Sequence, residues 1–142
     1  MTTKETVLLT GCAGFIGSNF VKTVACRPEV AQRYNFVIVD ALTYAGRMEN
    51  IQAELNAHPH LQFYQIDIRD AHKMHELFQK HAFSGVVNFA AESHVDRSIE
   101  SPNIFIETNV LGTLNLLKES LSLFEKKGHF RYLQVSTDEV YG

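Results

Sequence analysis

Short, mainly apolar runs recur along the chain and predict its strands. They are 7–10, 35–40, the start of 61–70, 85–91 and 131–136. Such runs are typical of strands that are buried on both faces of a parallel sheet. The first run leads directly into a cluster of glycines, as a buried strand does where it enters a helix.

Between the strands, apolar residues recur at helical spacing. The stretch 15–26 has helical character, and Pro28 follows it closely. Proline disfavours helical dihedrals in the residue before it, so the helix should end there. A second helix is predicted over 71–81. The apolar residues on one face of that helix are Met74, Leu77 and Phe78.

A third, long helix is predicted from Ser101 to about Lys127. Ser101 is typical of an N-cap, Pro102 suits the first helical position, and Gly128 ends the helix. We expect the apolar positions of this helix to pack mostly onto the sheet, with some facing a partner. These positions are Val110, Leu111, Leu114, Leu117 and Leu121.

Strand and helix alternate five times, without a composition shift, a repeat or a low-complexity linker. This alternation predicts an α/β fold, a Rossmann-type doubly wound parallel sheet in one domain over 1–142. Parallel strands need crossover connections, and no helix is predicted after the fifth strand. We therefore expect the sheet to be truncated after that strand and the domain to be incomplete.

Charge and cysteine content narrow the classes of function. The net charge is -3, and no run of Lys or Arg offers a surface for nucleic acid. No apolar stretch approaches the length of a membrane span or a signal peptide. Cys12 and Cys26 have neither metal-ligand spacing nor the density of a disulfide scaffold. We expect a cytoplasmic protein with free thiols, no metal, no membrane contact, and small-molecule chemistry.

The segment TGCAGFIG places Gly11, Gly14 and Gly17 at three-residue spacing after the first strand. In a dinucleotide-binding turn such glycines allow the tight turn, the approach of backbone to the pyrophosphate, and close packing of helix on strand. Because a strand precedes and a helix follows, we expect a dinucleotide site rather than a tight corner alone.

Asp40 ends the second predicted strand. A carboxylate at that position accepts hydrogen bonds from the ribose diol of the adenosine, and its negative charge repels a 2′-phosphate. The sequence therefore predicts a preference for NAD(H) over NADP(H).

Five segments resemble the dTDP-glucose 4,6-dehydratase family of the extended short-chain dehydrogenase/reductase superfamily. They are TGCAGFIGSNF, DALTYAG, NFAAESHVDRS, TNVLGT and STDEVYG. The first and fourth are shared by many nucleotide-sugar enzymes, and the others are more discriminating. The resemblance is to the N-terminal part of that family. It implies NAD as cofactor, a nucleotide sugar such as dTDP-glucose as substrate, and a homodimer in the full-length protein.

The resemblance also implies roles for single residues. Besides the three glycines, contacts to the NAD pyrophosphate and ribose fall on Phe15, Ile16, Asp40, Ala41, Leu42 and Thr43. Asp67 and Ile68 would flank the adenine. The nicotinamide half would be lined by Phe89, Ala90, Ala91, Glu92, Ser93 and Thr108. Ser93 and Thr137 would bind the hexose.

Asp138 and Glu139 are the implied general acid and general base. Oxidation at sugar carbon 4 acidifies the hydrogen on carbon 5, which Glu139 would remove while Asp138 protonates the departing 6-hydroxyl. Asp138 would then be the protonated member of the pair. From the residues alone, Ser136-x-x-Glu139 also fits a helix capping box. Two roles stay open for His94, which either contacts the substrate or cofactor or is a hydrogen-bonded histidine of the loop.

The superfamily's Tyr-x-x-x-Lys pair, which deprotonates the sugar 4-hydroxyl, is missing from the sequence. The residues four positions after Tyr34, Tyr44, Tyr64 and Tyr132 are Ile38, Met48, Ile68 and Ser136, and Tyr141 is too near the end of the sequence. We therefore expect this chain alone to have little or no activity. Two alternatives stay open. One is another extended nucleotide-sugar enzyme, namely a UDP-sugar dehydratase, decarboxylase or epimerase, and the other is a non-catalytic dinucleotide-binding module.

Overall fold

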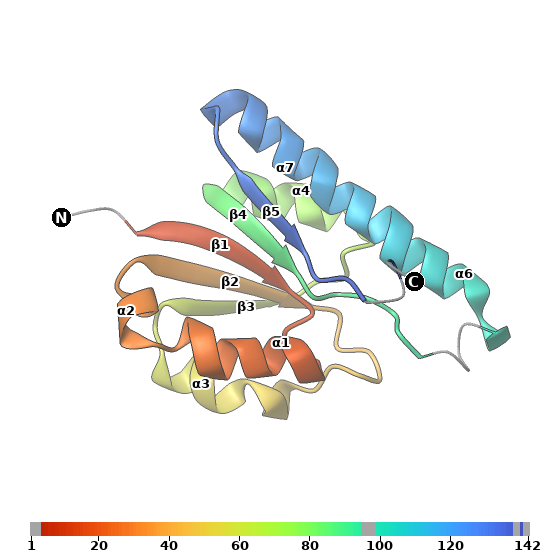
Figure 1. Cartoon of the computed structure of the whole chain (residues 1–142), viewed down its shortest axis with the longest axis horizontal. Coiled ribbons are helices and arrows are strands. Elements are labelled where there is room, and N and C mark those ends of the chain that lie inside the picture. The colour runs from red at the N-terminus through yellow and green to blue at the C-terminus, as the bar shows by residue number, and fades with distance from the viewer. Residues whose placement is uncertain (1–3, 95–98, 138–139, 141–142) are drawn as a thin grey trace.

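The computed structural model describes residues 4–94, 99–137 and 140 of the chain. Within these residues, five strands form one sheet in the order β3-β2-β1-β4-β5, and all neighbouring strands are parallel (Figure 1). The strands are β1 (Glu5–Thr10), β2 (Tyr34–Asp40), β3 (Leu61–Gln65), β4 (Phe83–Asn88) and β5 (Arg131–Gln134). The predicted α/β fold with a doubly wound parallel sheet is confirmed.

β1 lies at the centre of the sheet because the chain winds outward from it in both directions. β2 and β3 follow on one side, and β4 and β5 follow on the other. All five strands run the same way, so their carboxyl ends share one edge. Ligands of open α/β sheets bind in the crevice beyond the point where the strand order reverses. That point lies beside β1, among the loops that follow β1 and β4.

Helical segments connect the successive strands. They are α1 (Phe15–Phe20), π-helical η1 (Val21–Ala25), α2 (Pro28–Ala31), 3₁₀-helical η2 (Met48–Asn50), α3 (Gln52–Ala57), α4 (Ala71–Lys80), α6 (Pro102–Phe105), π-helical η3 (Ile106–Gly112) and α7 (Thr113–Lys127). The helix predicted over 15–26 is confirmed as α1 with η1, and the one over 71–81 as α4. The long helix is confirmed as α6, η3 and α7. The sequence patterns did not predict α2 or α3.

The start of the long helix differs from the prediction in one respect. Pro102 holds the first helical position, but the Ser101 side chain caps no amide among the described residues. The Ser101 backbone has ψ 65°, outside the extended region from which an N-cap side chain reaches back into the first turn. Ser101 therefore occupies the predicted N-cap position, but its side chain makes no capping hydrogen bond there.

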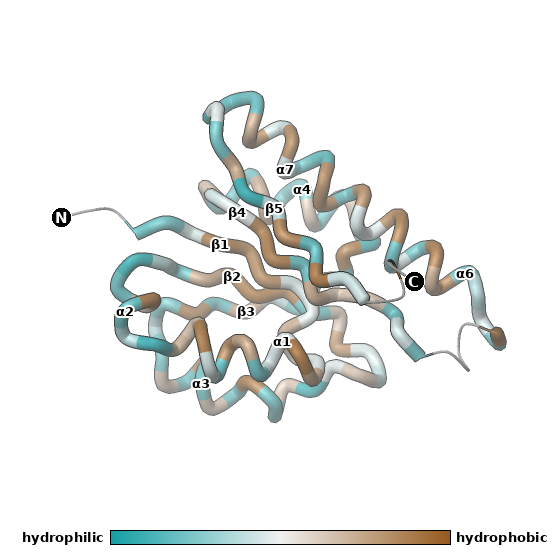
Figure 2. Tube along the Cα trace, in the orientation of Figure 1, coloured by the Kyte–Doolittle hydropathy of each residue, from teal (hydrophilic) through white to brown (hydrophobic). Residues whose placement is uncertain are grey.

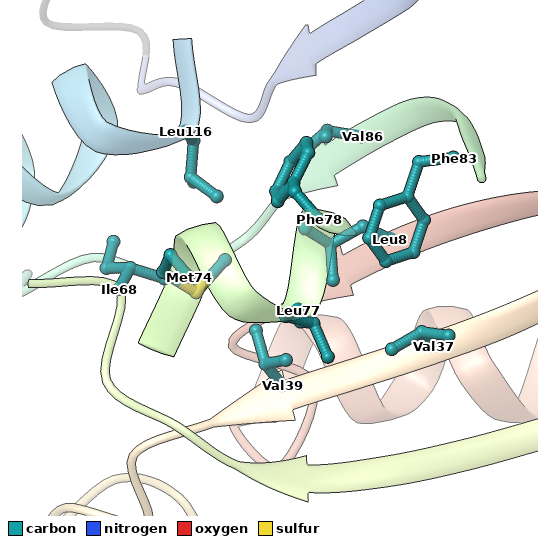
Figure 3. Close-up of a cluster of buried hydrophobic side chains, with 10 residues drawn as sticks. All are labelled: Leu8, Val37, Val39, Ile68, Met74, Leu77, Phe78, Phe83, Val86 and Leu116. Carbon is teal, nitrogen blue, oxygen red and sulfur yellow. The ribbon is translucent and has the colours of Figure 1, made fainter. Parts of the chain in front are cut away.

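One face of the sheet is covered by α4 and α7. Its core joins apolar side chains of β1, β2 and β4 to those of the two helices, as Figure 3 shows. The buried cluster consists of Leu8, Val37, Val39, Ile68, Met74, Leu77, Phe78, Phe83, Val86 and Leu116. The predicted apolar face of α4 is therefore buried.

The opposite face is covered by α1, η1 and α3 (Figure 1). Its buried cluster consists of Leu9, Cys12, Ala13, Val21, Ala25, Phe36, Ile38, Ile51 and Leu61. Successive residues of β1 and β2 thus enter opposite clusters, because side chains alternate across a strand. Both faces of these strands are buried, as their uninterrupted apolar runs predict.

The apolar stripe of η3 and α7 does not pack onto the sheet, so that prediction is wrong. Val110, Leu111, Leu114, Leu117 and Leu121 are 42–57% exposed. Figure 2 shows apolar positions recurring along this outer helix. The helix instead faces the sheet with another side, which has smaller side chains and includes the buried Gly112, Leu116 and Ser120.

The close approach of the helix explains which side faces inward. A Cβ on Gly112 would lie 2.7 Å from the Ile68 side chain, so only a small residue fits there. Ile106 and Phe124 are also exposed and extend the outer stripe at both ends. No helix of the described residues is long and apolar enough to cross a membrane.

Leu133 on β5 is also exposed. It pairs with Val87 of β4, and Val87 packs against the cluster on the α1 face. Paired residues of parallel strands point to the same face, so Leu133 belongs to that face as well. It is 57% exposed, because no described helix covers this part of β5.

Leu116→Ala should lower the free energy of unfolding by about 3 kcal/mol, because it leaves a cavity between α7 and the sheet. Leu117→Ala, which truncates the neighbouring half-exposed side chain, should cost less than about 1 kcal/mol. Urea denaturation of the two variants measures both values. Equal losses would show that the helix does not face the sheet through Leu116.

Candidate functional site

A groove of about 520 Å³ opens at the carboxyl edge of the sheet. Loops that follow β1, β2, β3 and β4 form its walls, together with Thr108 of η3. The predicted site residues that line it are Gly11, Gly14, Phe15, Ile16, Gly17, Asp40, Ala41, Thr43, Asp67, Ile68, Phe89, Ala90, Ala91, Glu92, Ser93 and Thr108. The fold therefore gathers them into one concave surface, while their ligand contacts stay predictions.

Some of the predicted residues lie elsewhere. Leu42 packs against the apolar cluster on the α1 face and does not line this groove. Thr137 is exposed and also lies outside the groove lining. Asp138 and Glu139 lie outside the described residues. Their acid and base roles, and the alternative capping box, stay predictions.

The glycine turn is built by close backbone approaches. Gly11 has φ +69°, and a Cβ there would lie 2.6 Å from the backbone of Ala90. A Cβ on Gly17 would lie 2.6 Å from the Gly11 carbonyl oxygen, so α1 packs directly against the turn. Gly14 precedes α1 in an extended conformation. Glycine at these positions lets the loop after β4 and α1 pack directly against the turn, and the three glycines line the groove.

Asp40 joins the glycine turn to the end of β2. Its Oδ2 accepts a hydrogen bond from the Ala13 backbone N–H at 2.8 Å, and its Oδ1 accepts one from the Leu42 N–H at 2.9 Å. A carboxylate oxygen has two lone pairs, so each oxygen retains one acceptor position. The side chain thus fixes the turn and can still accept hydrogen bonds from a ligand in the groove.

A chain of polar side chains connects the ends of β1, β4 and β5. The fully buried Thr10 hydroxyl donates to Oδ1 of Asn88, which is also fully buried. The Asn88 amide in turn donates to Oε1 of Gln134 at 2.8 Å. The Ala90 N–H donates to the same Asn88 oxygen at 3.1 Å. These bonds hold the loop after β4 against the glycine turn.

Glu92 is held in the groove wall from two sides. The Asn109 side chain accepts from the Glu92 N–H at 2.8 Å and donates to the Glu92 carbonyl at 2.9 Å. The Tyr44 hydroxyl donates to Oε2 of Glu92 at 3.0 Å. Because β1 lies between β2 and β4 in the sheet, the Tyr44–Glu92 bond joins loops on either side of the glycine turn.

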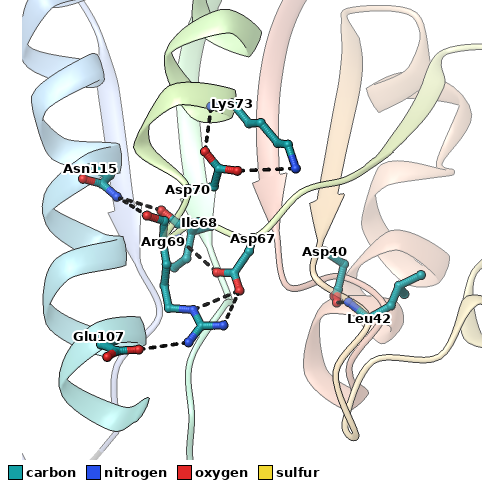
Figure 4. Close-up of polar contacts among 9 residues, drawn as sticks. All are labelled: Asp40, Leu42, Asp67, Ile68, Arg69, Asp70, Lys73, Glu107 and Asn115. Atoms are coloured by element: carbon teal, nitrogen blue, oxygen red, sulfur yellow. Dashed lines mark hydrogen bonds and ion pairs between the residues drawn. The ribbon is translucent and has the colours of Figure 1, made fainter. Parts of the chain in front are cut away.

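Arg69 and Asp67 form a close ion pair in the loop after β3, as Figure 4 shows. Burial raises the pKa of Asp67, but the side-chain and backbone hydrogen bonds from Arg69 outweigh it and hold that pKa below its usual value. The hydrogen bond to Asp67 raises the pKa of Arg69 in turn. Asp67 is therefore an ionised acceptor at neutral pH.

The two cysteines are free thiols, as predicted. Cys12 is buried in the glycine turn. Burial, followed by the charge of Asp40, raises the pKa of its thiol far above the usual range. Thiolate is the reactive form, so Cys12 is chemically inert and serves to pack the turn.

Sequence patterns missed several residues of the groove. They are Tyr44, Gly46 and Arg69. All three follow the carboxyl end of a strand by a few residues, and this position was the available signal. His94, for which a ligand contact was one of two open predictions, also lines the groove beside Tyr44, with 5.8 Å between their ring centroids. Their contacts join distant parts of the chain, which spacing along the sequence does not show.

Comparisons with known proteins agree with this geometry. The family model for GDP-mannose 4,6 dehydratase matches residues 8–142. The dTDP-glucose 4,6-dehydratase of Xanthomonas campestris pv. campestris (strain B100) is 47% identical over 96% of this chain and 39% of the relative. The enzyme of the same name from Escherichia coli (strain K12) is 43% identical over 96% of this chain and 38% of the relative. The chain thus spans about two fifths of the length of these relatives.

Solved structures give the same result. DesIV, a dTDP-glucose 4,6-dehydratase from Streptomyces venezuelae with NAD and TYD bound, matches with TM-score 0.81 and 44% identity over 96% of this chain and 41% of that one. A dTDP-glucose 4,6-dehydratase from Bacillus anthracis in complex with NAD matches with TM-score 0.75 and 38% identity, and the match covers 97% of this chain and 39% of that one. The UDP-glucose 4-epimerase of Thermotoga maritima matches with TM-score 0.75 and 30% identity over 93% and 38%.

Gly11→Ala should lower the free energy of unfolding by about 3 kcal/mol or more, because it adds a clash with Ala90 to the strain of a positive φ. Gly128→Ala is the matched control. Gly128 has φ +74° and nothing within 4 Å of its Cβ position, so the change should cost about 1 kcal/mol. Urea denaturation compares the two variants, and similar losses would exclude the close approach of Gly11 to Ala90.

Proposed function

Because the chain belongs to the GDP-mannose 4,6-dehydratase family, we propose that it is the NAD-binding portion of a dTDP-glucose 4,6-dehydratase. The names of relatives that are 43–47% identical support this activity. The chain spans about 39% of their length, so the complete reaction is proposed for a longer protein that contains it. A cytoplasmic location is part of the same proposal.

The observation that carries the proposal is the pairing of the glycine turn with Asp40 in one groove. Gly11 and Gly14 line the groove in a turn of the kind that holds a pyrophosphate, and the retained acceptor positions of Asp40 fit a ribose diol. Two dTDP-glucose 4,6-dehydratases of similar structure were crystallised with NAD. We therefore propose NAD as the cofactor of this chain.

The remaining groove residues divide between the two ends of the cofactor. Asp67 and Ile68 would flank the adenine, and the segment 89–93 with Thr108 would line the nicotinamide half. The hydrogen bonds that join Thr10, Asn88 and Gln134 support this half, because they fix the loop after β4. The sugar would lie beyond Ser93, towards Thr137.

The proposed reaction converts dTDP-glucose to dTDP-4-keto-6-deoxyglucose and water. When bound, the cofactor would supply the hydride acceptor for sugar carbon 4 as NAD⁺ and the hydride donor for carbon 6 as NADH. Glu139 would remove the proton on carbon 5, and Asp138 would protonate the departing 6-hydroxyl. Thr137 and Ser93 would hold the hexose in place for both transfers. Because no Tyr-x-x-x-Lys pair is present in these 142 residues, we propose that the chain alone turns over little substrate.

A UDP-sugar epimerase is the second candidate, since the Thermotoga maritima epimerase has the same fold. Its sequence identity of 30% is lower than the 44% of DesIV. The 4,6-dehydratase is therefore the better supported activity.

We also propose that the protein self-associates through the exposed stripe of η3 and α7. Six large apolar side chains follow one another along the outer side of this helix. They are Ile106, Val110, Leu114, Leu117, Leu121 and Phe124. Contiguous exposed apolar surface of this kind marks interaction sites, and a homodimer would cover the stripe with its own copy.

Titration calorimetry of the purified chain should show saturable binding of NAD⁺, and binding of NADP⁺ at least about 10-fold weaker because Asp40 repels the 2′-phosphate. Equal binding of the two cofactors would contradict the role of Asp40. Binding of neither would contradict the proposal that this chain holds NAD.

Leu121→Asp should shift the protein towards the monomer in sedimentation velocity, because it places a charge within the apolar interface. Lys126→Asp introduces the same side chain at an exposed position outside the stripe and should leave the association state unchanged. If both variants sediment like the unmodified protein, another surface mediates association. A monomeric unmodified protein would contradict self-association.

A further inference from the structure

We propose that Arg69 is a positioning residue that leaves the Asp67 carboxylate one acceptor position for the cofactor, and so makes the adenine subsite select an amino group. The inference rests on the proposed function, since it takes NAD as the ligand of the groove. It assigns to Arg69 a role that the motifs of the chain did not indicate.

The hydrogen bonds between the two residues fill one carboxylate oxygen. Arg69 donates to Oδ2 of Asp67 from Nε at 2.9 Å and from Nη2 at 2.6 Å. The Arg69 backbone N–H donates to Oδ1 at 2.9 Å. Since each oxygen has two lone pairs, Oδ2 is saturated and Oδ1 keeps one acceptor position. The orientation of that remaining position is fixed by the three bonds.

Arg69 is itself held from the long helix (Figure 4). Its Nη1 donates to Oε2 of Glu107 at 3.1 Å, and Glu107 directly precedes Thr108 of the groove. Nδ2 of Asn115 donates to the carbonyl of Ile68 at 3.0 Å and to that of Arg69 at 3.2 Å. The guanidinium thus bridges Asp67 and Glu107, while Asn115 holds the backbone on which Arg69 stands.

An ionised carboxylate only accepts hydrogen bonds, so its partner in a ligand must be a donor. The 6-amino group of adenine is a donor, whereas the 6-oxo group of hypoxanthine is a second acceptor. A site built to pair a ligand N–H rejects the analogue that lacks it, because its own polar group stays unpaired. Asp67 is 28% exposed, so solvent weakens this discrimination.

The test is calorimetric titration with NAD⁺ and with nicotinamide hypoxanthine dinucleotide. The unmodified protein should bind NAD⁺ about 10-fold more tightly. Arg69→Met should weaken NAD⁺ binding about 10-fold and leave binding of the hypoxanthine analogue within about 3-fold, so that the preference disappears. Arg69→Lys keeps the charge but not the two-nitrogen contact and should retain a preference of about 3-fold.

Lys73→Met is the matched control. Lys73 also pairs with a carboxylate, that of Asp70 at 3.4 Å, but it lies on α4 and does not line the groove. Its removal should leave the affinities for both dinucleotides unchanged. A control that loses the preference would assign the effect to net charge and overturn the inference.

The pH dependence of binding is a second readout, which a purely structural role would not change. The pKa of Asp67 is held below its usual value, so NAD⁺ affinity of the unmodified protein should be constant from pH 7 to pH 5. Without Arg69 the pKa of Asp67 rises, so the NAD⁺ affinity of Arg69→Met should begin to fall at a higher pH than that of the unmodified protein.

Four further results would overturn the inference. The first is an unchanged preference in both Arg69 variants, and the second is an equal loss of affinity for the two dinucleotides. Either would show that Arg69 only connects the loop after β3 to the long helix. Equal binding of the two dinucleotides to the unmodified protein would show that the site does not distinguish the 6-amino group, although the chain binds NAD. Binding of neither dinucleotide would contradict the proposed function as well.

Discussion

The site depends on the hydrogen bonds that join the buried Thr10 and Asn88 to Gln134 across three strands. They fix the carboxyl ends of β1, β4 and β5 relative to one another. The loop after β4 can therefore lie so close to the glycine turn that only Gly11 fits against Ala90. A buried amide without these partners would cost free energy, so the bonds also disfavour a shifted strand register.

Two carboxylates organise the loops on the other side of β1, and each is held by groups of the protein itself. Asp40 accepts hydrogen bonds from backbone N–H groups of the glycine turn and of its own loop. Asp67 takes the side chain and the backbone of Arg69. Both keep some acceptor capacity, so the groove presents fixed negative charge to a ligand without rearrangement. Such preorganisation lowers the entropy that binding must overcome.

The sequence predicted the sheet and most of the groove because strand burial and glycine spacing are local patterns. It failed on the long helix for a physical reason. The apolar stripe through Leu114, Leu117 and Leu121 is the stronger pattern, but the weaker stripe of Gly112, Leu116 and Ser120 faces the sheet. Small residues let the helix approach Ile68, and hydropathy does not register that requirement. The contacts of Tyr44 and Arg69 were missed because they span 48 and 38 residues.

The central place of β1 has a consequence for the order of folding. The contact of Ala13 with Asp40 closes a segment of 27 residues, whereas that of Thr10 with Asn88 closes one of 78. The longer closure costs about 1 kcal/mol more chain entropy. We expect the glycine turn and β2 to come together early, and pairing of β1 with β4 to be the slower event. The half of the groove that holds Asp40 would then serve as the template on which the other half assembles.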